Sequence, residues 1–434
     1  MFKKAALMFS FTLALSVAAV PATSSPVDAV NWGTNSSISV RRRASFTKPN
    51  GVFDKDKAVA ATVATKNKHR QNLINLQKNK GLAAFNAGAK IGVPASVPVD
   101  VEARLLRKRQ DEGLTDEQQD LEWAGGISVG TPKHNFLIDF DTGSADLWIP
   151  SSACKSSTCA KKSKYNPGSS STSSKKPGKF SIEYGDRSSV SGPIYTDTVT
   201  VAGIALHDQY FSGVDTLSSL FEDSPVDGIL GMAWPSISNL QQEPFFNKAI
   251  DSGAVKAGVF GLYLASSRST LYLGGTDTSK YRGEIEYINI DNRGGFWRAT
   301  GGEVKVGGSA VVRNIDTIID SGTTLMYGPP SLVAEIFAKV KGSRLFDKDN
   351  GYYSYPCNSP PTISFSWGGA DWTIFPENIN LGATAVGSTN CVASLAAMDL
   401  GLGKSVFLLG DAYMKNVYSV FNFDKAKVGF AELK

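Results

Sequence analysis

A five-residue motif occurs twice in this chain, and the interval between its copies constrains the fold more than any other feature. Phe-Asp-Thr-Gly-Ser at residues 140–144 returns 179 residues later as Ile-Asp-Ser-Gly-Thr at residues 319–323. Ile-Leu-Gly at residues 229–231 returns after the same interval as Leu-Leu-Gly at residues 408–410. In both copies the apolar pair and glycine lie 88 residues after an aspartate. The shared intervals indicate two copies of one structural unit.

A third Asp-Ser-Gly tripeptide, Asp251-Ser252-Gly253, does not belong to this repeat. Alanine follows it where the other copies have serine or threonine, and Lys-Val-Lys stands 88 residues beyond it. We therefore expect it to be the end of a short helix, capped by Gly253.

The chain from about residue 121 onward predicts a mainly β fold class with a few short helices. Short β-type runs alternate with Gly, Ser, Asn and Pro; examples are 136–140, 196–201, 271–273, 285–290 and 304–306. Helical spacing is clearest at residues 331–340, after Pro330, and at Phe245–Ile250.

The first 22 residues predict a signal peptide. Lys3 and Lys4 precede an apolar run from Ala5 to Val20, and small residues follow at the expected cleavage region. The run is short for a membrane span, so we expect no membrane anchor.

Charge divides the chain at about residue 109. Residues 1–109 hold 18 of the 45 Lys and Arg residues but only 5 of the 40 Asp and Glu residues, so the remainder is net acidic. The basic part ends in Arg107-Lys108-Arg109, a dibasic processing site. We therefore interpret residues 23–109 as a basic propeptide with a helix at 66–80, and we exclude nucleic acid as a partner because the body is acidic.

Four cysteines in an exported protein predict two disulfides. Three pairings are possible, and the spacing along the chain favours Cys154 with Cys159 and Cys357 with Cys391. A zinc site is the rival interpretation, but none of the three histidines has ligand spacing with a cysteine, so we expect no metal and no other cofactor.

The repeated aspartates suggest hydrolysis by an activated water. One of two close carboxylates can take a proton from water while the other gives a proton to a carbonyl oxygen, because they cannot both ionise at short distance. The glycines allow close backbone approach, and the hydroxyls can hydrogen-bond across the two loops or to the carboxylates. The candidate dyad is Asp141 and Asp320, supported by Thr142, Gly143, Ser144, Ser321, Gly322 and Thr323.

Four segments carry a resemblance to the pepsin family of aspartic peptidases, of the fungal secreted or vacuolar type. They are Phe-Asp-Thr-Gly-Ser-Ala-Asp-Leu-Trp-Ile-Pro-Ser at 140–151, Val-Asp-Gly-Ile-Leu-Gly-Met-Ala-Trp-Pro at 226–235, Ile-Asp-Ser-Gly-Thr-Thr at 319–324 and Phe-Leu-Leu-Gly-Asp at 407–411. The resemblance implies a bilobal fold with pseudo-two-fold symmetry and a cleft between the lobes. It divides the chain into an N-terminal lobe at 110–300 and a C-terminal lobe at 301–434. It also agrees with both cysteine spacings.

A hairpin at residues 180–192 resembles the family's flap, which closes over the substrate. Tyr184 matches the flap tyrosine, with Gly185 and Asp186 after it. Trp148 matches the tryptophan that accepts support from the flap tyrosine, and it could equally be a core residue. A carboxylate at Asp186 suggests that lysine is accepted before the scissile bond as well as large apolar residues.

Three further apolar residues match positions that line the family's substrate pockets: Phe221, Ile229 and Phe296. Each could instead be a core residue.

These features together predict a secreted aspartic endopeptidase, made as a zymogen, that hydrolyses internal peptide bonds of polypeptide substrates at acid pH. The propeptide is expected to act as an intramolecular inhibitor, with a lysine or histidine of residues 66–70 reaching the dyad. We expect a monomer. The alternatives are a vacuolar destination and a catalytically inactive pepsin-like binding protein.

Overall fold

The computed structural model describes residues 37–40, 46–111, 123–183, 189–222, 224–265 and 269–434. The predicted signal peptide lies outside these residues. The described residues are mostly strand, so the predicted mainly β fold class is confirmed.

Two seven-stranded sheets contain the two motif copies. The first has the order β2-β3-β8-β4-β7-β6-β5 and the second β18-β17-β12-β13-β22-β14-β21. The first consists of β2 Ala124–Val129, β3 His134–Asp141, β4 Leu147–Pro150, β5 Ser174–Glu183, β6 Ser189–Val201, β7 Ile204–Val214 and β8 Gly228–Gly231. The second consists of β12 Arg298–Val306, β13 Ser309–Ile319, β14 Met326–Gly328, β17 Ile363–Ser366, β18 Trp372–Thr373, β21 Leu395–Ala397 and β22 Val406–Leu409. The predicted lobe boundary at 300/301 lies inside β12.

The strand register repeats the sequence interval. Strand β3 pairs in parallel with β8 so that Phe140 faces Leu230, and β13 pairs in parallel with β22 so that Ile319 faces Leu409. The next strand in each sheet, β4 or β14, runs antiparallel to β8 or β22. Each repeated apolar pair therefore lies beside the strand that carries its aspartate, which explains the 88-residue spacing.

Two smaller sheets complete the β structure. A six-stranded sheet has the order β1-β10-β9-β23-β24-β11, and a four-stranded sheet has the order β15-β16-β20-β19. Their strands are β1 Ser37–Val40, β9 Val259–Tyr263, β10 Ser269–Leu273, β11 Tyr281–Asn289, β15 Arg344–Asp347, β16 Tyr352–Pro356, β19 Asn380–Ala383, β20 Asn390–Ala393, β23 Tyr418–Asn422 and β24 Lys427–Leu433. Residues 23–109, the basic segment ahead of the body, are called the leader from here on. Strand β1 belongs to the leader and pairs with β10, so the leader contributes a strand to the first of these sheets.

The α-helices are few and mostly short: α1 Lys55–Lys80, α2 Val99–Asp111, α3 Phe245–Asp251, α4 Pro330–Ala338, α5 Pro376–Ile379 and α6 Asp411–Met414. Helix α3 ends as expected at the third tripeptide, where Gly253 has φ +68°. Helix α4 begins at Pro330, whose fixed φ suits the first helical turn, and it ends two residues before the predicted end.

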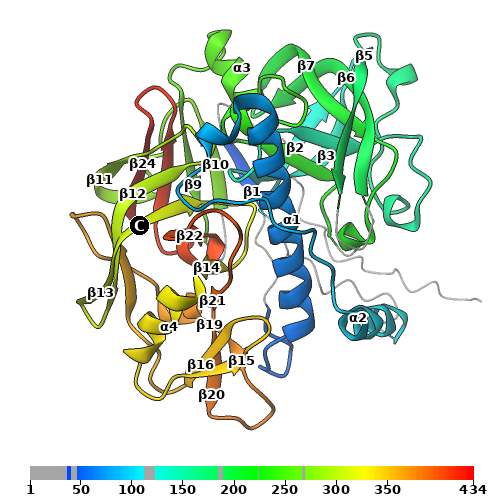
Figure 1. Cartoon of the computed structure of the whole chain (residues 1–434). Coiled ribbons are helices and arrows are strands. Elements are labelled where there is room, and N and C mark those ends of the chain that lie inside the picture. The colour runs from blue at the N-terminus through cyan, green and yellow to red at the C-terminus, as the bar shows by residue number, and fades with distance from the viewer. Residues whose placement is uncertain (1–36, 41–45, 112–122, 184–188, 223, 266–268) are drawn as a thin grey trace, which may run out of the picture. The chain divides into compact units, whose positions relative to one another are not determined.

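The leader helix α1 is longer than the predicted 66–80. It begins at Lys55, because the Asp54 carboxylate accepts a hydrogen bond from Lys57 N at 3.3 Å and caps the first turn. Its first turns bury Ala58, Val59 and Val63. Figure 1 shows α1, in blue, passing between strands β2, β3 and β5 on one side and β14, β21 and β22 on the other.

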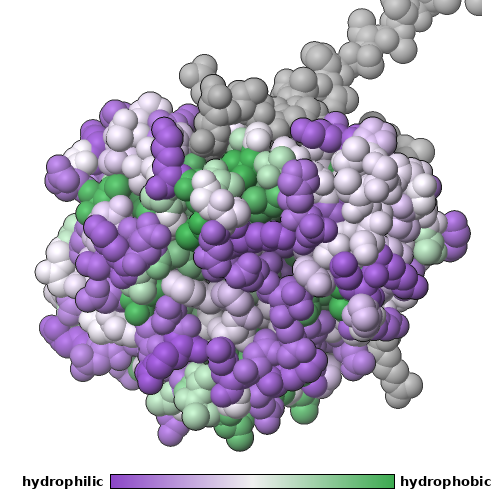
Figure 2. Space-filling view, turned by 90° about the horizontal axis from the view of Figure 1, so that it is seen from above, coloured by the Kyte–Doolittle hydropathy of each residue, from purple (hydrophilic) through white to green (hydrophobic). Residues whose placement is uncertain are grey.

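Both favoured disulfides are present. Cys154 is bonded to Cys159 and Cys357 to Cys391, with Cα–Cα distances of 6.1 and 5.0 Å. Within the described residues no helix is long and apolar enough to cross a membrane. Hydrophilic side chains cover most of the face in Figure 2, with smaller apolar areas between them.

Candidate active site

The two repeated aspartates lie at the ends of equivalent strands. Asp141 is the last residue of β3, and Asp320 directly follows β13. Both carboxylates are fully buried. A Cβ atom on Gly143 would overlap the Asp320 carboxylate, and one on Gly322 would overlap that of Asp141. Each glycine therefore lets its loop lie against the opposite aspartate.

Four hydrogen bonds join the two aspartate loops. Thr142 N donates to Ser321 Oγ at 3.0 Å and Ser321 N donates to Thr142 Oγ1 at 2.9 Å. The two hydroxyls then donate to carbonyl oxygens across the junction, Thr142 to Ile319 at 3.0 Å and Ser321 to Phe140 at 2.6 Å. The reciprocal pattern fixes the two loops against each other, because each of the two buried hydroxyls both donates and accepts a hydrogen bond across the junction.

Replacing Thr142 with valine is expected to lower the free energy of unfolding by about 2 kcal/mol, because Ser321 N–H and the Ile319 carbonyl would both lose their partners in the interior. Urea denaturation measures the change. Thr216→Val is the matched control, since the Thr216 hydroxyl is exposed and donates to the neighbouring Asp215 at 3.1 Å. An equal effect of the two substitutions would contradict a structural role for the cross-loop bonds.

Further donors hold the carboxylates. Gly143 N donates to Asp141 Oδ1 and Gly322 N to Asp320 Oδ1, each at 2.9 Å. Thr323 Oγ1 donates to Asp320 Oδ2 at 2.7 Å. The equivalent Ser144 hydroxyl differs. Its buried oxygen acts to lower the pKa of Asp141, against the larger effect of burial, which raises that pKa.

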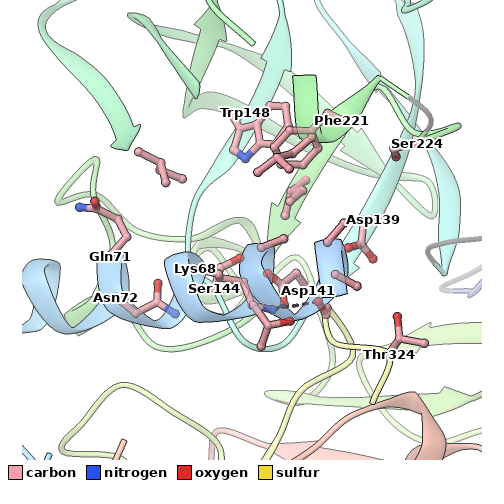
Figure 3. Close-up of a pocket in the computed structure, with 18 of the residues that line it drawn as sticks. Lys68, Gln71, Asn72, Asp139, Asp141, Ser144, Trp148, Phe221, Ser224 and Thr324 are labelled. Carbon is pink, nitrogen blue, oxygen red and sulfur yellow. Dashed lines mark hydrogen bonds and ion pairs between the residues drawn. The ribbon is translucent and has the colours of Figure 1, made fainter. Parts of the chain in front are cut away.

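Leader helix α1 places a cation between the two aspartates. Lys68 Nζ lies 3.0 Å from oxygens of both Asp141 and Asp320, and it also donates to the Gly322 carbonyl at 3.0 Å. The buried His69 Nε2 lies 3.0 Å from Asp320 Oδ2. Figure 3 shows Lys68 and Asn72 reaching from α1 toward the loop of Asp141 and Ser144. Both a lysine and a histidine of residues 66–70 therefore contact the pair.

Burial and the two leader residues set the charges of the pair. Burial raises the pKa of Asp141, and nearby Asp320 adds to this rise against the opposing charge of Lys68. Burial acts on Asp320 as well, but Lys68 and His69 outweigh it and hold the pKa of Asp320 well below its ordinary value. Burial alone would lower the pKa of Lys68, but the two carboxylates raise it. The arrangement keeps Lys68 charged beside at least one ionised aspartate.

A cavity of about 220 Å³ opens beside the aspartates, between α1 and the first seven-stranded sheet. Trp148, Phe221 and Ile229 are among its lining residues, and the rings of Trp148 and Phe221 meet edge to face with centroids 5.2 Å apart. Figure 3 shows these two rings on one wall of the cavity. Phe296 lies elsewhere: it is buried with its ring centroid 5.7 Å from that of His69, and it is not among the lining residues.

The hairpin expected to act as a flap is formed by β5 and β6, which pair antiparallel up to Glu183 and Ser189. Phe180 and Ile182 of β5 line the cavity. Tyr184, Gly185 and Asp186 lie outside the described residues, so their roles remain predictions.

Sequence reasoning missed several residues at the site. Asp139 lines the cavity two residues before Asp141 on the same strand, where the alternation of side chains was an available signal. Tyr327 also lines it, and the 179-residue interval from Trp148 leads directly to it. Asp146 is buried and accepts hydrogen bonds from Ser238 Oγ, Asn239 N and Leu240 N; burial raises its pKa.

Metal ligation has no support in the described part of the chain, where no group of three or more His, Cys, Asp or Glu side chains could hold an ion. The site itself consists of two buried carboxylates beside a largely apolar cavity.

Comparison with known proteins places the chain among proteases. The model for the family described as "Eukaryotic aspartyl protease" matches residues 122–433. An aspartic protease of Phaffia rhodozyma is 39% identical over 76% of this chain and 81% of its own. Rhizopuspepsin-1 of Rhizopus niveus is 31% identical over 88% of this chain and 93% of its own, and pepsin A of Sus scrofa is 33% identical over 86% and 95%. The last two matches cover more than residues 122–433, so they extend into the leader.

Proposed function

Because the chain belongs to the eukaryotic aspartyl protease family, we propose that it is made as an exported, inactive precursor and hydrolyses internal peptide bonds of polypeptides at acid pH. The observation that carries this proposal is the pair Asp141 and Asp320, buried together at the ends of equivalent strands. The family is one of aspartic endopeptidases, which act on polypeptide substrates.

In the proposed reaction the two carboxylates share one proton. The ionised member takes a proton from a water molecule, whose oxygen attacks the peptide carbonyl, while the other member gives its proton to the carbonyl oxygen. The apolar cavity lined by Trp148, Phe221 and Ile229 would receive a substrate side chain. The titration belongs to the pair, so the roles are assigned to the dyad and not to one aspartate.

The leader would inhibit the precursor by occupying the dyad. Lys68 Nζ takes the position between the carboxylates that a reacting water needs. Asn72 Nδ2 donates to the Gly143 carbonyl at 2.7 Å, and Asn75 Nδ2 donates to the Ile237 carbonyl at 3.0 Å. Helix α1 therefore satisfies backbone groups of the body while it blocks the catalytic pair.

Two further ion pairs support this inhibitory role. Lys55 lies 2.7 Å from Asp347, and Lys90 lies 2.9 Å from Asp399. Burial alone would raise the pKa of each carboxyl, but Lys55 lowers the pKa of Asp347, and the Gly401 N–H and Lys90 lower that of Asp399. The basic leader thus forms ion pairs with acidic groups of the acidic body.

Export follows from the predicted signal peptide, with the extracellular space favoured over a vacuole. The matches that extend into the leader are consistent with a precursor organisation. We expect the enzyme to act as a monomer.

The proposal is tested with acid-treated protein and denatured haemoglobin between pH 2.5 and 7, with and without pepstatin. We expect hydrolysis only on the acid side and its loss with the inhibitor. A folded sample freed of its leader and without activity would favour the alternative, a binding protein that uses the cleft without catalysis.

A further inference from the structure

A set of lysines on the body has no part in the proposed catalysis. Residues 147–182 contain seven lysines, no aspartate, no glutamate and no arginine, although the chain after residue 109 is net acidic. One of the seven, Lys162, is buried and donates to the carbonyls of Ser224 and Val226. Lys176 is half-exposed and projects from the opposite side of β5 to its neighbour Lys175. The other five are exposed or half-exposed and are called the lysine face: Lys155, Lys161, Lys164, Lys175 and Lys179.

The segments that carry the lysine face are held together in space. Tyr165 is the link: its hydroxyl donates to Ser173 Oγ at 2.6 Å, and its carbonyl accepts from Ser152 N at 2.8 Å. The Tyr165 ring also packs on Tyr195, with centroids 5.7 Å apart, and Tyr195 is the β6 partner of Lys175. The disulfide loop at 154–159, the segment at 161–165 and strand β5 therefore form one continuous surface.

Two buried carboxylates lie behind this surface: Asp197 accepts from the hydroxyls of Tyr165 and Thr172, and Asp227 accepts from Ser163 N, but neither is paired with a lysine of the lysine face. Among the residues that the structure describes, none of the five lysines forms an ion pair. Lys155 and Lys164 donate to the uncharged carbonyls of Ser152 and Cys154, at 2.9 and 3.2 Å. The local field is therefore positive on an otherwise acidic body.

Protection of a sheet edge accounts for only part of the lysine face. Strand β5 is the last strand of its sheet, and lysines, Pro177 and the bulge between Lys176 and Lys179 all discourage pairing with another chain. Lys155, Lys161 and Lys164 lie outside the strand, so edge protection does not require them.

The composition of the surface identifies the class of partner. Nucleic-acid and phosphate sites rely on arginine forks and stacked aromatic rings, and protein interfaces rely on exposed aromatic or apolar anchors. Residues 147–182 contain no arginine, and no strongly exposed large apolar side chain of the described chain lies there. Lysines among eleven serines and two threonines instead offer point charges and hydroxyl hydrogen bonds.

We propose that the lysine face binds an acidic polysaccharide, a polymer of uronate-type sugars. Lysine ammonium groups would pair with the carboxylates, and the serine and threonine hydroxyls would hydrogen-bond to the sugar hydroxyls. None of the five lysines lines the cavity beside the aspartates. The bound polymer therefore leaves that cavity free, and this inference stands whether or not the proposed peptidase activity is correct.

Lysine footprinting of the full chain tests the proposal. The protein is acetylated at neutral pH in low salt with polygalacturonate or with uncharged dextran, and each lysine is quantified by mass spectrometry. We expect polygalacturonate to slow acetylation of the lysine face by about three-fold or more, and the effect to disappear at high salt because such pairs are screened. Five exposed body lysines serve as internal controls: Lys256, Lys339, Lys341, Lys348 and Lys425.

A matched pair of variants completes the test. The first variant changes Lys155, Lys161, Lys164, Lys175 and Lys179 to glutamine, and it should be retained on a polygalacturonate resin no longer than on a dextran resin. The second variant changes the five control lysines to glutamine, and it should keep most of the extra retention that the wild type shows on polygalacturonate. Equal loss in both variants, or protection confined to the leader lysines, would overturn the proposal. So would protection by dextran sulfate or an acidic protein without protection by polygalacturonate.

Discussion

Asp141→Asn is expected to lower kcat/KM on a peptide substrate by about 10⁴-fold or more, with the fold intact, because an amide cannot take the proton of the attacking water. Asparagine keeps the shape of aspartate and can still accept the hydrogen bond from Gly143 N. The measurement uses protein freed of its leader, and near-ultraviolet circular dichroism checks its folding. Asp320→Asn should give a loss of similar size, since the two carboxylates act as one unit.

The chain supplies its own control in Asp251, which stands in an equal Asp-Ser-Gly tripeptide at the exposed end of α3. Asp251→Asn should leave kcat/KM unchanged. Retained activity in the Asp141 variant would refute the dyad mechanism, and a large loss in the Asp251 variant would show that the assay reports folding and not catalysis.

Lys68→Met is expected to weaken the hold of the leader and to release peptidase activity at a higher pH. Removing one partner of a buried ion pair costs about 3 kcal/mol, or roughly a 10²-fold increase in the open population. Lys68 and His69 hold the pKa of Asp320 below its ordinary value, so their stabilising effect is present above the ordinary carboxyl range and is lost as pH falls below it. In the Lys68→Met variant, the leader should therefore dissociate from the aspartates at a weakly acid pH at which the wild-type leader remains bound.

The measurement is the rate of leader cleavage and of peptide hydrolysis as pH is lowered stepwise from 7 to 2.5. Lys78→Met is the matched control, because Lys78 lies on the same helix but is exposed in its last turn. It removes the same charge from the leader without touching the aspartates. If both variants convert at the wild-type pH, Lys68 does not keep the precursor closed.

The repeat made it possible to predict that Asp141 and Asp320 lie together. Two different motifs recur after the same 179 residues, and two copies of one structural unit explain this most simply. Cysteine spacing similarly favoured the two disulfides. The start of α1 was less predictable: Ala58, Val59 and Val63 show their role only when the body packs on them. The sequence also could not show whether Lys68 or His69 contacts the aspartates. Adjacent residues of a helix point in different directions, and the other contacts of α1 set the orientation in which both side chains reach the pair.

The contacts of α1 also make two nearly equivalent aspartates unequal. Lys68 contacts both, but His69 contacts only Asp320. A duplicated site has little of its own to distinguish its halves beyond small differences such as that between Ser144 and Thr323. In this structure a single helix, which has no repeat of its own, supplies most of that distinction. Under the proposed function the asymmetry at the dyad would be temporary: removal of the leader would return the two carboxylates to near equivalence, and the bound substrate would then determine which of them holds the proton.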